Sequence, residues 1–325
     1  MGILTVVCTG DRTALMPRQR IFRSLARRLF PSGQTPLGAR LEVTRIATYG
    51  QYREYAAERR DQRLQRKLTE RNLIANDSSF TVSGRCFVCR RDTRLEVNFS
   101  YAYAVDGQLT PNWREHLRCP SCGLNNRMRA AIHILEQECA VRPGHSIYIT
   151  EQTTPLFQVL RDRYRNLSAS EYLGATRPFG TTDRDGVRNE SVVRLTYSSN
   201  AFDHILSFDV FEHVPDPVKG FAECFRCLRP GGKLLFSVPF TEHPDTLVRA
   251  REHPDQTVEH LLPPEYHGDP RNAAGCLCFY HFGWDLLDTM RKLGFTETSG
   301  LFYWSREFGY LGNGDQIIFL AQKPL

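Results

Sequence analysis

Hydrophobic and polar positions alternate in a regular way along the C-terminal half of the chain. Short β-branched or apolar runs predict strands at 145–150, 167–173, 202–208, 233–238, 295–304 and 316–322. Apolar residues at helical spacing predict helices over 155–164, 216–228 and 282–293. Thr154 and Pro155 mark the start of the first helix, because threonine caps helices and proline fits their first turn. Repeated strand–helix units predict an α/β fold with a mainly parallel sheet covered on both faces.

The N-terminal half has a different pattern. Residues 1–50 are expected to be irregular except for a short basic helix over 17–30. Residues 51–75 lack proline and glycine and are rich in Arg, Glu and Gln, which predicts a polar helix. We expect ion pairs there between Glu54 or Glu58 and Arg59 or Arg63. A further helix is predicted over 125–142, where Ile132, Ile134 and Leu135 supply apolar positions.

Net charge distinguishes the first 80 residues from the rest of the chain. The chain has 325 residues, 41% hydrophobic and 24% charged, which excludes a wholly disordered protein. Residues 1–80 hold 15 basic and 7 acidic residues, whereas residues 81–325 hold 27 and 29. The basic arm is either a solvated helical face or a surface for an anionic partner. The sequence shows no run of 18 apolar residues and no signal-peptide core, so we expect a cytoplasmic protein without a membrane partner.

Four of the ten cysteines form two pairs with a two-residue gap, Cys86 with Cys89 and Cys119 with Cys122. This gap lets both thiolates of a pair reach one ion, and two such pairs complete a tetrahedral zinc site. Leu95, Val97, Phe99, Tyr101 and Tyr103 alternate between the pairs like a strand. The segment resembles a zinc ribbon with structural zinc. Cys224 and Cys227 lie in a helical pattern and are expected in the core.

Residues 202–240 carry the pattern that is most informative about the fold. A strand ends in Asp209, a turn contains Glu212 and His213, and a helix is followed by Gly231 and Gly232 before another strand. This order resembles class I S-adenosylmethionine-dependent methyltransferases over about residues 145–323. The resemblance implies a Rossmann-like, seven-stranded methyltransferase sheet that binds S-adenosyl-L-methionine. Ligands of such sheets bind beyond the carboxyl ends of the strands.

The loop after the first strand lacks the glycines that the resembled enzymes usually have, so its side chains would crowd a cofactor. The resemblance places the ribose at Glu171, after the second strand, and the adenine near Glu190 and Ser191. The predicted cofactor-binding residues are Thr150, Glu151, Gln152, Thr153, Glu171, Tyr172, Glu190, Ser191 and Asp209.

An insertion at 241–281 holds five of the ten histidines and is expected to form the substrate site. His267 and His213 are the candidate general bases or substrate-positioning groups, with Glu212 or Asp209 orienting one of them. A second metal at His243, His260, His267 or Glu265 is a weaker interpretation, because their spacing matches no compact ligand motif.

The sequence thus predicts four parts: a basic helical arm at 1–80, a zinc ribbon at 81–125, a linking helix at 126–144 and a methyltransferase-like domain at 145–325. The favoured function is methyl transfer to a small molecule such as a sugar or natural product. One alternative keeps the fold without methyl transfer, for example intramolecular cyclisation in natural-product biosynthesis, in a heteromeric complex or alone. Others are RNA methylation, with Arg127 and Arg129 extending a basic surface, and a non-enzymatic subunit that binds a protein partner through the arm or ribbon. The mildly acidic C-terminal domain argues against nucleic acid.

Overall fold

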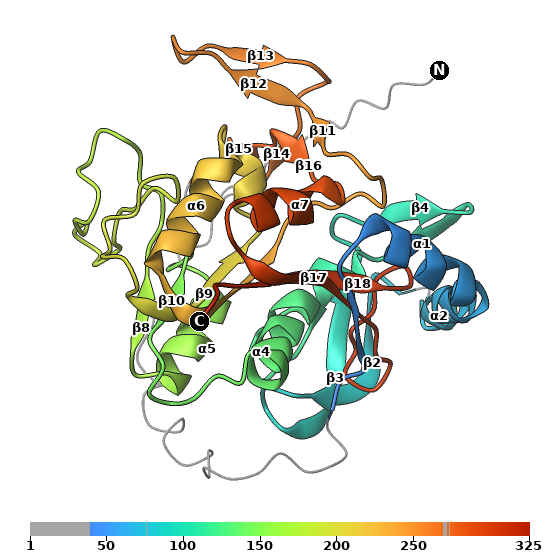
Figure 1. Ribbon diagram of the computed structural model, residues 1–325. Coiled ribbons are helices and arrows are strands. Elements are labelled where there is room, and N and C mark those ends of the chain that lie inside the picture. The colour runs from blue at the N-terminus through green and yellow to red at the C-terminus, as the bar shows by residue number, and fades with distance from the viewer. Residues whose placement is uncertain (1–39, 76, 269–271, 273) are drawn as a thin grey trace. The chain divides into compact units, whose positions relative to one another are not determined.

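The computed structural model describes residues 40–75, 77–268, 272 and 274–325, and residues 40–325 form one compact unit (Figure 1). The helix expected over 17–30 and Cys8 lie outside the described residues. None of the helices in the described part of the chain has the length and apolar character needed to cross a bilayer.

A seven-stranded mixed sheet forms the centre of this unit, which confirms the predicted α/β class. Its order is β1-β17-β18-β10-β9-β7-β8. Strands β8, β7, β9 and β10 run parallel, and β18 is antiparallel to both of its neighbours. The strands are β1 (Val43–Ile46), β7 (Ile147–Ile149), β8 (Leu167–Ala169), β9 (Phe202–Phe208), β10 (Leu228–Ser237), β17 (Thr296–Tyr303) and β18 (Gln316–Gln322).

The edge strand β1 corrects the sequence prediction, because residues 1–50 were expected to contain no strand. Val43 to Ile46 pair antiparallel with β17, and Ile46 is only 2% exposed. Four residues are too few to give a periodic signal, and β1 is a strand because β17 offers it an unpaired edge. The N-terminal arm therefore supplies part of the methyltransferase-like sheet.

Helices cover both faces of the sheet, as predicted: α6 and α7 lie on one face, α4 and α5 on the other (Figure 1). Their bounds are α4 (Asn126–Glu138), α5 (Pro155–Arg163), α6 (Pro217–Cys227) and α7 (Asp285–Lys292). Asn125, Thr154 and Asp216 cap the first three through their side chains. Helix α7 begins three residues later than expected because Phe282 instead forms a parallel bridge to Phe240.

The polar segment predicted as one helix over 51–75 is two helices, α1 (Tyr49–Glu58) and α2 (Arg60–Asn72), that meet at Arg59. Its ion pairs also differ from the expected ones. Arg63 pairs with Glu242 at 2.5 Å and with Asp315 at 3.1 Å, and Arg59 lies 3.6 Å from Glu42. Arg63 therefore attaches the arm to the C-terminal domain, whereas Arg59 pairs within the arm, and both contacts remove part of the charge that an anionic partner would meet.

The predicted ribbon contains a three-stranded antiparallel sheet and a small hairpin. The elements are β2 (Ser79–Cys86), β3 (Arg91–Asn98), β6 (Leu117–Arg118), the hairpin β4 (Tyr103–Val105) with β5 (Gln108–Thr110), and α3 (Trp113–His116). Leu95 and Val97 are buried as expected, but β3 ends at Asn98. Tyr101 has a φ of 55° and is 84% exposed, so the predicted alternation stops before it.

Arg129 on α4 is fully buried and donates to the carbonyls of Phe308 at 2.5 Å and Gly309 at 3.2 Å. It joins α4 to the loop before β18, so the expectation that Arg129 extends a basic RNA surface is wrong.

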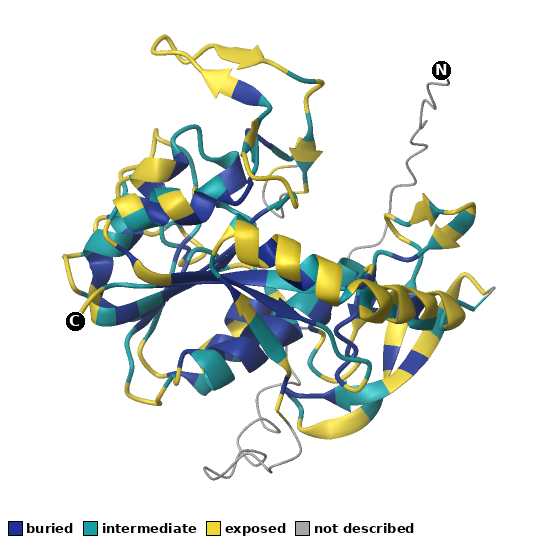
Figure 2. Cartoon of the chain, turned by 45° about the vertical axis from the view of Figure 1, so that its right-hand side comes forward, coloured by how far each residue is buried: buried dark blue, intermediate teal, exposed yellow. Residues whose placement is uncertain are grey.

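Six short strands organise the insertion. They pair as β11 (Leu247–Val248) with β16 (Tyr280–His281), β12 (Ala250–Glu252) with β13 (Val258–His260), and β14 (Tyr266–His267) with β15 (Cys276–Leu277). The hairpin β12–β13 is mainly exposed (Figure 2). The bridge between Phe240 and Phe282 closes the base of the insertion.

Candidate active site

Three acidic residues follow three neighbouring parallel strands. Glu151 follows β7, Glu171 follows β8, and Asp209 follows β9. Because β7 pairs with both β8 and β9, the carboxyl ends of these strands form one edge of the sheet. The sequence predicted all three residues at this edge.

Glu171 organises the loop that lacks glycine. Its Oε1 accepts hydrogen bonds from Gln152 N at 2.7 Å, Thr153 N at 2.8 Å and Thr153 Oγ1 at 2.8 Å. Oε2 receives no donor from the residues that the structure describes. The loop amides, which could otherwise bind an anion, are thus already paired with an acid of the chain. The side chain of Gln152 points away from these amides: its Nε2 donates to Gly186 O and its Oε1 accepts from Arg188 N, both at 2.9 Å.

Glu151 is half-buried, and its buried Oε1 atom has no hydrogen-bond partner among the described residues. Burial raises its pKa to about 7, although the Thr154 hydroxyl and Arg127 favour the ionised form. Glu171 and Asp209 add to the rise in pKa through like-charge repulsion. A cationic or hydrogen-bond-donating ligand at this edge would meet an acceptor that the protein itself leaves unpaired.

Asp209 has a φ of 54°, a left-handed conformation at the end of β9. Its carboxylate accepts two bonds from Arg114, at 2.9 and 2.8 Å, and one from Ser237 Oγ at 2.8 Å, and Arg127 lies 3.5 Å away. Burial alone would raise the pKa of Asp209, but Arg114 and Arg127 outweigh it and hold the pKa well below its usual range.

Arg114 lies on α3 and was not predicted as a site residue, since only the fold brings it to β9. The cavity beside Arg114 and Arg127 has a volume of about 10 Å³, lined also by Phe208, Ser237 and Tyr303. That is roughly the space for one water molecule. This cavity is therefore too small to hold a nucleoside.

The other predicted cofactor residues lie in different surroundings. Glu190 is 2% exposed and accepts from Arg188 Nε at 2.8 Å and Thr196 N at 2.9 Å. Tyr172 is 64% exposed. Thr150 Oγ1 lies 3.0 Å from Ser207 Oγ, and Ser191 forms an isolated bridge with Arg194. Of these, Tyr172 presents the largest free surface to a ligand.

The three predicted catalytic residues lie together. The 3-10 helix η2 (Phe211–His213) carries Glu212 and His213 directly beyond β9, and β14 carries His267. Glu212 Oε1 is 3.6 Å from both His213 Nε2 and His267 Nδ1. The insertion is held there by the bond from Phe279 N to Glu212 O at 2.7 Å. Contacts with Cys278 and Glu212 raise the pKa of His267 to about 11, against the effect of burial.

Both histidines use their second ring nitrogen for an ordered contact. His213 Nδ1 lies 2.8 Å from Leu277 O, and His267 Nε2 lies 3.0 Å from Glu265 Oε1. Glu265 also contacts His281 Nε2 at 3.0 Å and Arg249 at 3.2 Å. Among the described residues, no group with metal-ligand spacing includes His243 or His260. The sequence-based set for a second metal therefore does not assemble.

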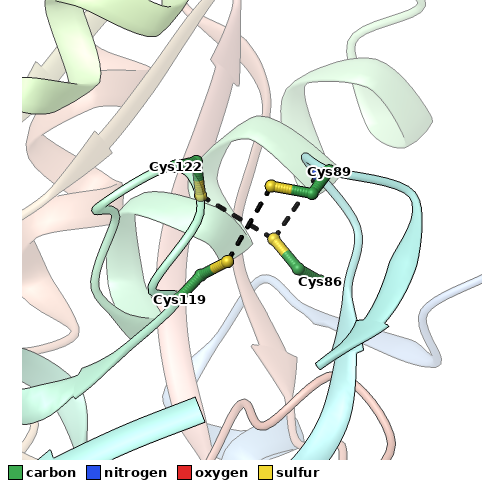
Figure 3. A group of neighbouring side chains, drawn as sticks. All are labelled: Cys86, Cys89, Cys119 and Cys122. Carbon is green, nitrogen blue, oxygen red and sulfur yellow. Dashed lines mark hydrogen bonds between the residues drawn. The ribbon is translucent and has the colours of Figure 1, made fainter. Parts of the chain in front are cut away.

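The four cysteines of the ribbon converge on one point (Figure 3). Cys86 Sγ is 3.8 Å from Cys122 Sγ, and Cys89 Sγ is 3.8 Å from Cys119 Sγ. Tetrahedral zinc with Zn–S bonds of about 2.3 Å places its sulfurs roughly 3.8 Å apart. Cys89 N points to Cys86 Sγ at 3.5 Å, as expected for such a turn. The arrangement fits a closed structural zinc site.

Comparison with known proteins finds similarity to methyltransferases over part of the chain. Residues 150–236 match the family model described as "Methyltransferase domain". Phosphoethanolamine N-methyltransferase 2 of Caenorhabditis elegans is 38% identical over 148 residues, which cover 39% of this chain and 34% of that protein. Ubiquinone biosynthesis O-methyltransferase of Coxiella burnetii is 37% identical over 76 residues, covering 22% of this chain and 30% of that protein.

Among solved structures, the 1,6-didemethyltoxoflavin-N1-methyltransferase of Burkholderia thailandensis, bound to S-adenosylhomocysteine, is 18% identical with a TM-score of 0.36. The match covers 61% of this chain and 78% of that one.

Residues 150–236 are therefore similar to a methyltransferase domain, which confirms the resemblance of the motifs in this segment. The chain spans about a third of the length of the two curated relatives named above. Their names include an N-methyltransferase and an O-methyltransferase, so this similarity leaves the acceptor atom open.

Proposed function

We propose that the protein transfers a methyl group from S-adenosylmethionine to a small molecule. The observation that carries the proposal is the convergence of Glu151, Glu171 and Asp209 at the ends of three neighbouring parallel strands. All three lie in the segment that matches the methyltransferase-domain model. The matched relatives with small-molecule substrates in their names support this choice of acceptor class.

The hydrogen-bond acceptors at this edge of the sheet are compatible with the cofactor. Glu171 Oε2 can accept from ribose hydroxyls, and Glu151 Oε1, buried and unpartnered among the described residues, can accept from the cofactor's ammonium group. When bound, S-adenosylmethionine supplies an electrophilic methyl group. Asp209 is already paired with Arg114 and Arg127. We therefore propose that Asp209 holds the ribbon against the sheet edge and does not contact the cofactor directly.

The insertion provides the acceptor side of the proposal. Glu212 and His213 lie directly beyond β9, and His267 on β14 faces them. The cluster can orient an acceptor, and His213 can take up the acceptor's proton. Most of the rate enhancement would come from alignment of the acceptor with the methyl group. The ribbon, with zinc at Cys86, Cys89, Cys119 and Cys122, has a structural task, since all four positions around the ion are filled by protein.

A labelling experiment tests this function. The purified protein is incubated with methyl-labelled S-adenosylmethionine and with separate low-mass and RNA fractions of a cell extract. We expect label in the low-mass fraction, loss of labelling in Glu171→Ala, and unchanged labelling in Glu54→Gln, which alters an exposed residue of α1. Label in RNA alone would favour the RNA alternative. Conversion of a small molecule without S-adenosylmethionine would favour the cyclisation alternative, and absence of any transfer would contradict methylation.

A further inference from the structure

Glu212 has an unusual environment for a carboxylate. Its side chain is 0% exposed, and neither of its oxygens has a hydrogen-bond partner among the described residues. Burying an unpaired carboxylate is strongly unfavourable unless a positive charge compensates it. The nearest histidine nitrogens in this cluster are His213 Nε2 and His267 Nδ1, each 3.6 Å from Glu212 Oε1. This distance is too long for a hydrogen bond.

The distances match those between the ligands of a small metal ion. With metal–nitrogen and metal–oxygen bonds of about 2.0–2.1 Å, neighbouring ligand atoms in a tetrahedron lie roughly 3.4 Å apart. Glu212 Oε1 lies 3.6 Å from His213 Nε2 and from His267 Nδ1, and the ligand atoms of the three residues all lie within 4.8 Å of one another. A two-histidine, one-carboxylate set suits a divalent transition metal with an open position.

The remaining ring nitrogens support the same assignment. A histidine that binds metal through one nitrogen usually donates the other N–H to a carbonyl or carboxylate, which fixes its tautomer. His213 Nδ1 lies 2.8 Å from Leu277 O, which leaves Nε2 to face Glu212. His267 Nε2 lies 3.0 Å from Glu265 Oε1, which leaves Nδ1 to face Glu212. Glu265 is itself held by Arg249 and His281.

We infer that Glu212, His213 and His267 bind a divalent first-row transition metal ion at the junction of β9 and the insertion, with at least one coordination position open to a ligand. This differs from the four-cysteine site, where protein sulfurs fill all positions. The chemical alternative is that protonated histidines alone balance the charge of Glu212. The role of the open position rests on the proposed function: an acceptor hydroxyl bound there would lose its proton more readily.

Metal content tests the inference without any enzymatic assay. The full-length protein is incubated with zinc or cobalt(II), passed through a desalting column and measured by mass spectrometry for metal per chain. We expect two equivalents in the wild type and one in His213→Ala, His267→Ala and Glu212→Gln. His253→Ala, on the exposed β12–β13 hairpin, should retain two. In the cobalt(II) spectra, thiolate charge-transfer absorption comes from the cysteine site. It should therefore be the same in the wild type and in the three variants, although the variants hold less cobalt.

Glu212→Gln keeps the shape of the side chain, so zinc retained at the cysteines reports that this variant is folded. One equivalent in the wild type with both metals, or two in all three variants, would overturn the inference in favour of charge pairing alone. Loss of the second metal in Cys278→Ser but not in His213→Ala would also overturn it, because it would place the ion at the neighbouring group of Glu265, Cys278 and His281. The metal count involves no methyl donor, so it can fail while methyl transfer stands.

Discussion

The buried carboxylate of Glu151 allows a prediction whose sign and size follow from its surroundings. Its pKa is about 7 in the folded protein, whereas an ordinary glutamate has a pKa of 4.5. Since the pKa is raised, the folded state retains the proton between these values, and folding becomes less favourable as the pH rises through them. Above pH 7 the full penalty is present. A rise of this size corresponds to about 3 kcal/mol.

Glu151→Gln removes the titrating group and keeps its shape. We expect little change in stability near pH 4.5, where the wild-type carboxyl is neutral when folded. Near pH 8.5 the variant should be more stable by up to about 3 kcal/mol, or roughly 5 °C or more in melting temperature. Thermal unfolding of both proteins at the two pH values measures the difference, with Glu54→Gln as the control for an exposed carboxylate.

Equal effects of Glu151→Gln at both pH values, or a loss of stability at pH 8.5, would refute the reasoning. Either result would mean that the carboxylate is compensated in the folded state by Arg127 and Thr154 more than burial penalises it.

Three other perturbations have predicted outcomes. Cys119→Ser should release the ribbon zinc and lower the unfolding free energy by several kcal/mol, seen by metal analysis together with thermal unfolding, and normal metal content would contradict the four-sulfur site. Glu70→Gln should cost about 1–3 kcal/mol in urea unfolding, because an amide cannot accept all the bonds that the carboxylate receives from Gly312 N, Asn313 N and Trp304 Nε1 at 2.6–2.9 Å. Burial raises the pKa of Glu70 despite these bonds, so an unchanged or higher stability would mean that the cost of burying the charge exceeds the gain from the bonds. Arg114→Met should cost about 2 kcal/mol at pH 7 and less as the pH falls toward the lowered pKa of Asp209, whereas a cost independent of pH would indicate lost packing alone.

The sequence was most informative where local patterns determine structure. Two-residue gaps between cysteines predicted Cys86, Cys89, Cys119 and Cys122 as one group, because the gap itself fixes which atoms can meet. Strand β9 and the Asp209 that follows it were found from the apolar run and the glycines further along the chain. The trio of Glu212, His213 and His267 was named from residue type and placement in the insertion, and the fold brings it together.

Features that depend on distant pairing were missed. Strand β1 is four residues long and forms only against β17. Arg114 reaches Asp209 across 95 positions in the chain, and no local pattern marks it. Arg129 looked like a surface cation but fills the space between α4 and Phe308. The tautomer of His267 depends on Glu265, whose neighbour Arg249 comes from an earlier part of the insertion.

The central claim is that the edge formed by β7, β8 and β9 binds the nucleoside cofactor. Calorimetric titration with S-adenosylhomocysteine tests it directly, in the wild type and in Glu171→Gln, with Glu54→Gln as the control. We predict one equivalent bound by the wild type and the control, and at least about tenfold weaker binding by Glu171→Gln, the loss of roughly 1.4 kcal/mol. No binding by the wild type, or equal affinity in Glu171→Gln, would contradict the assignment.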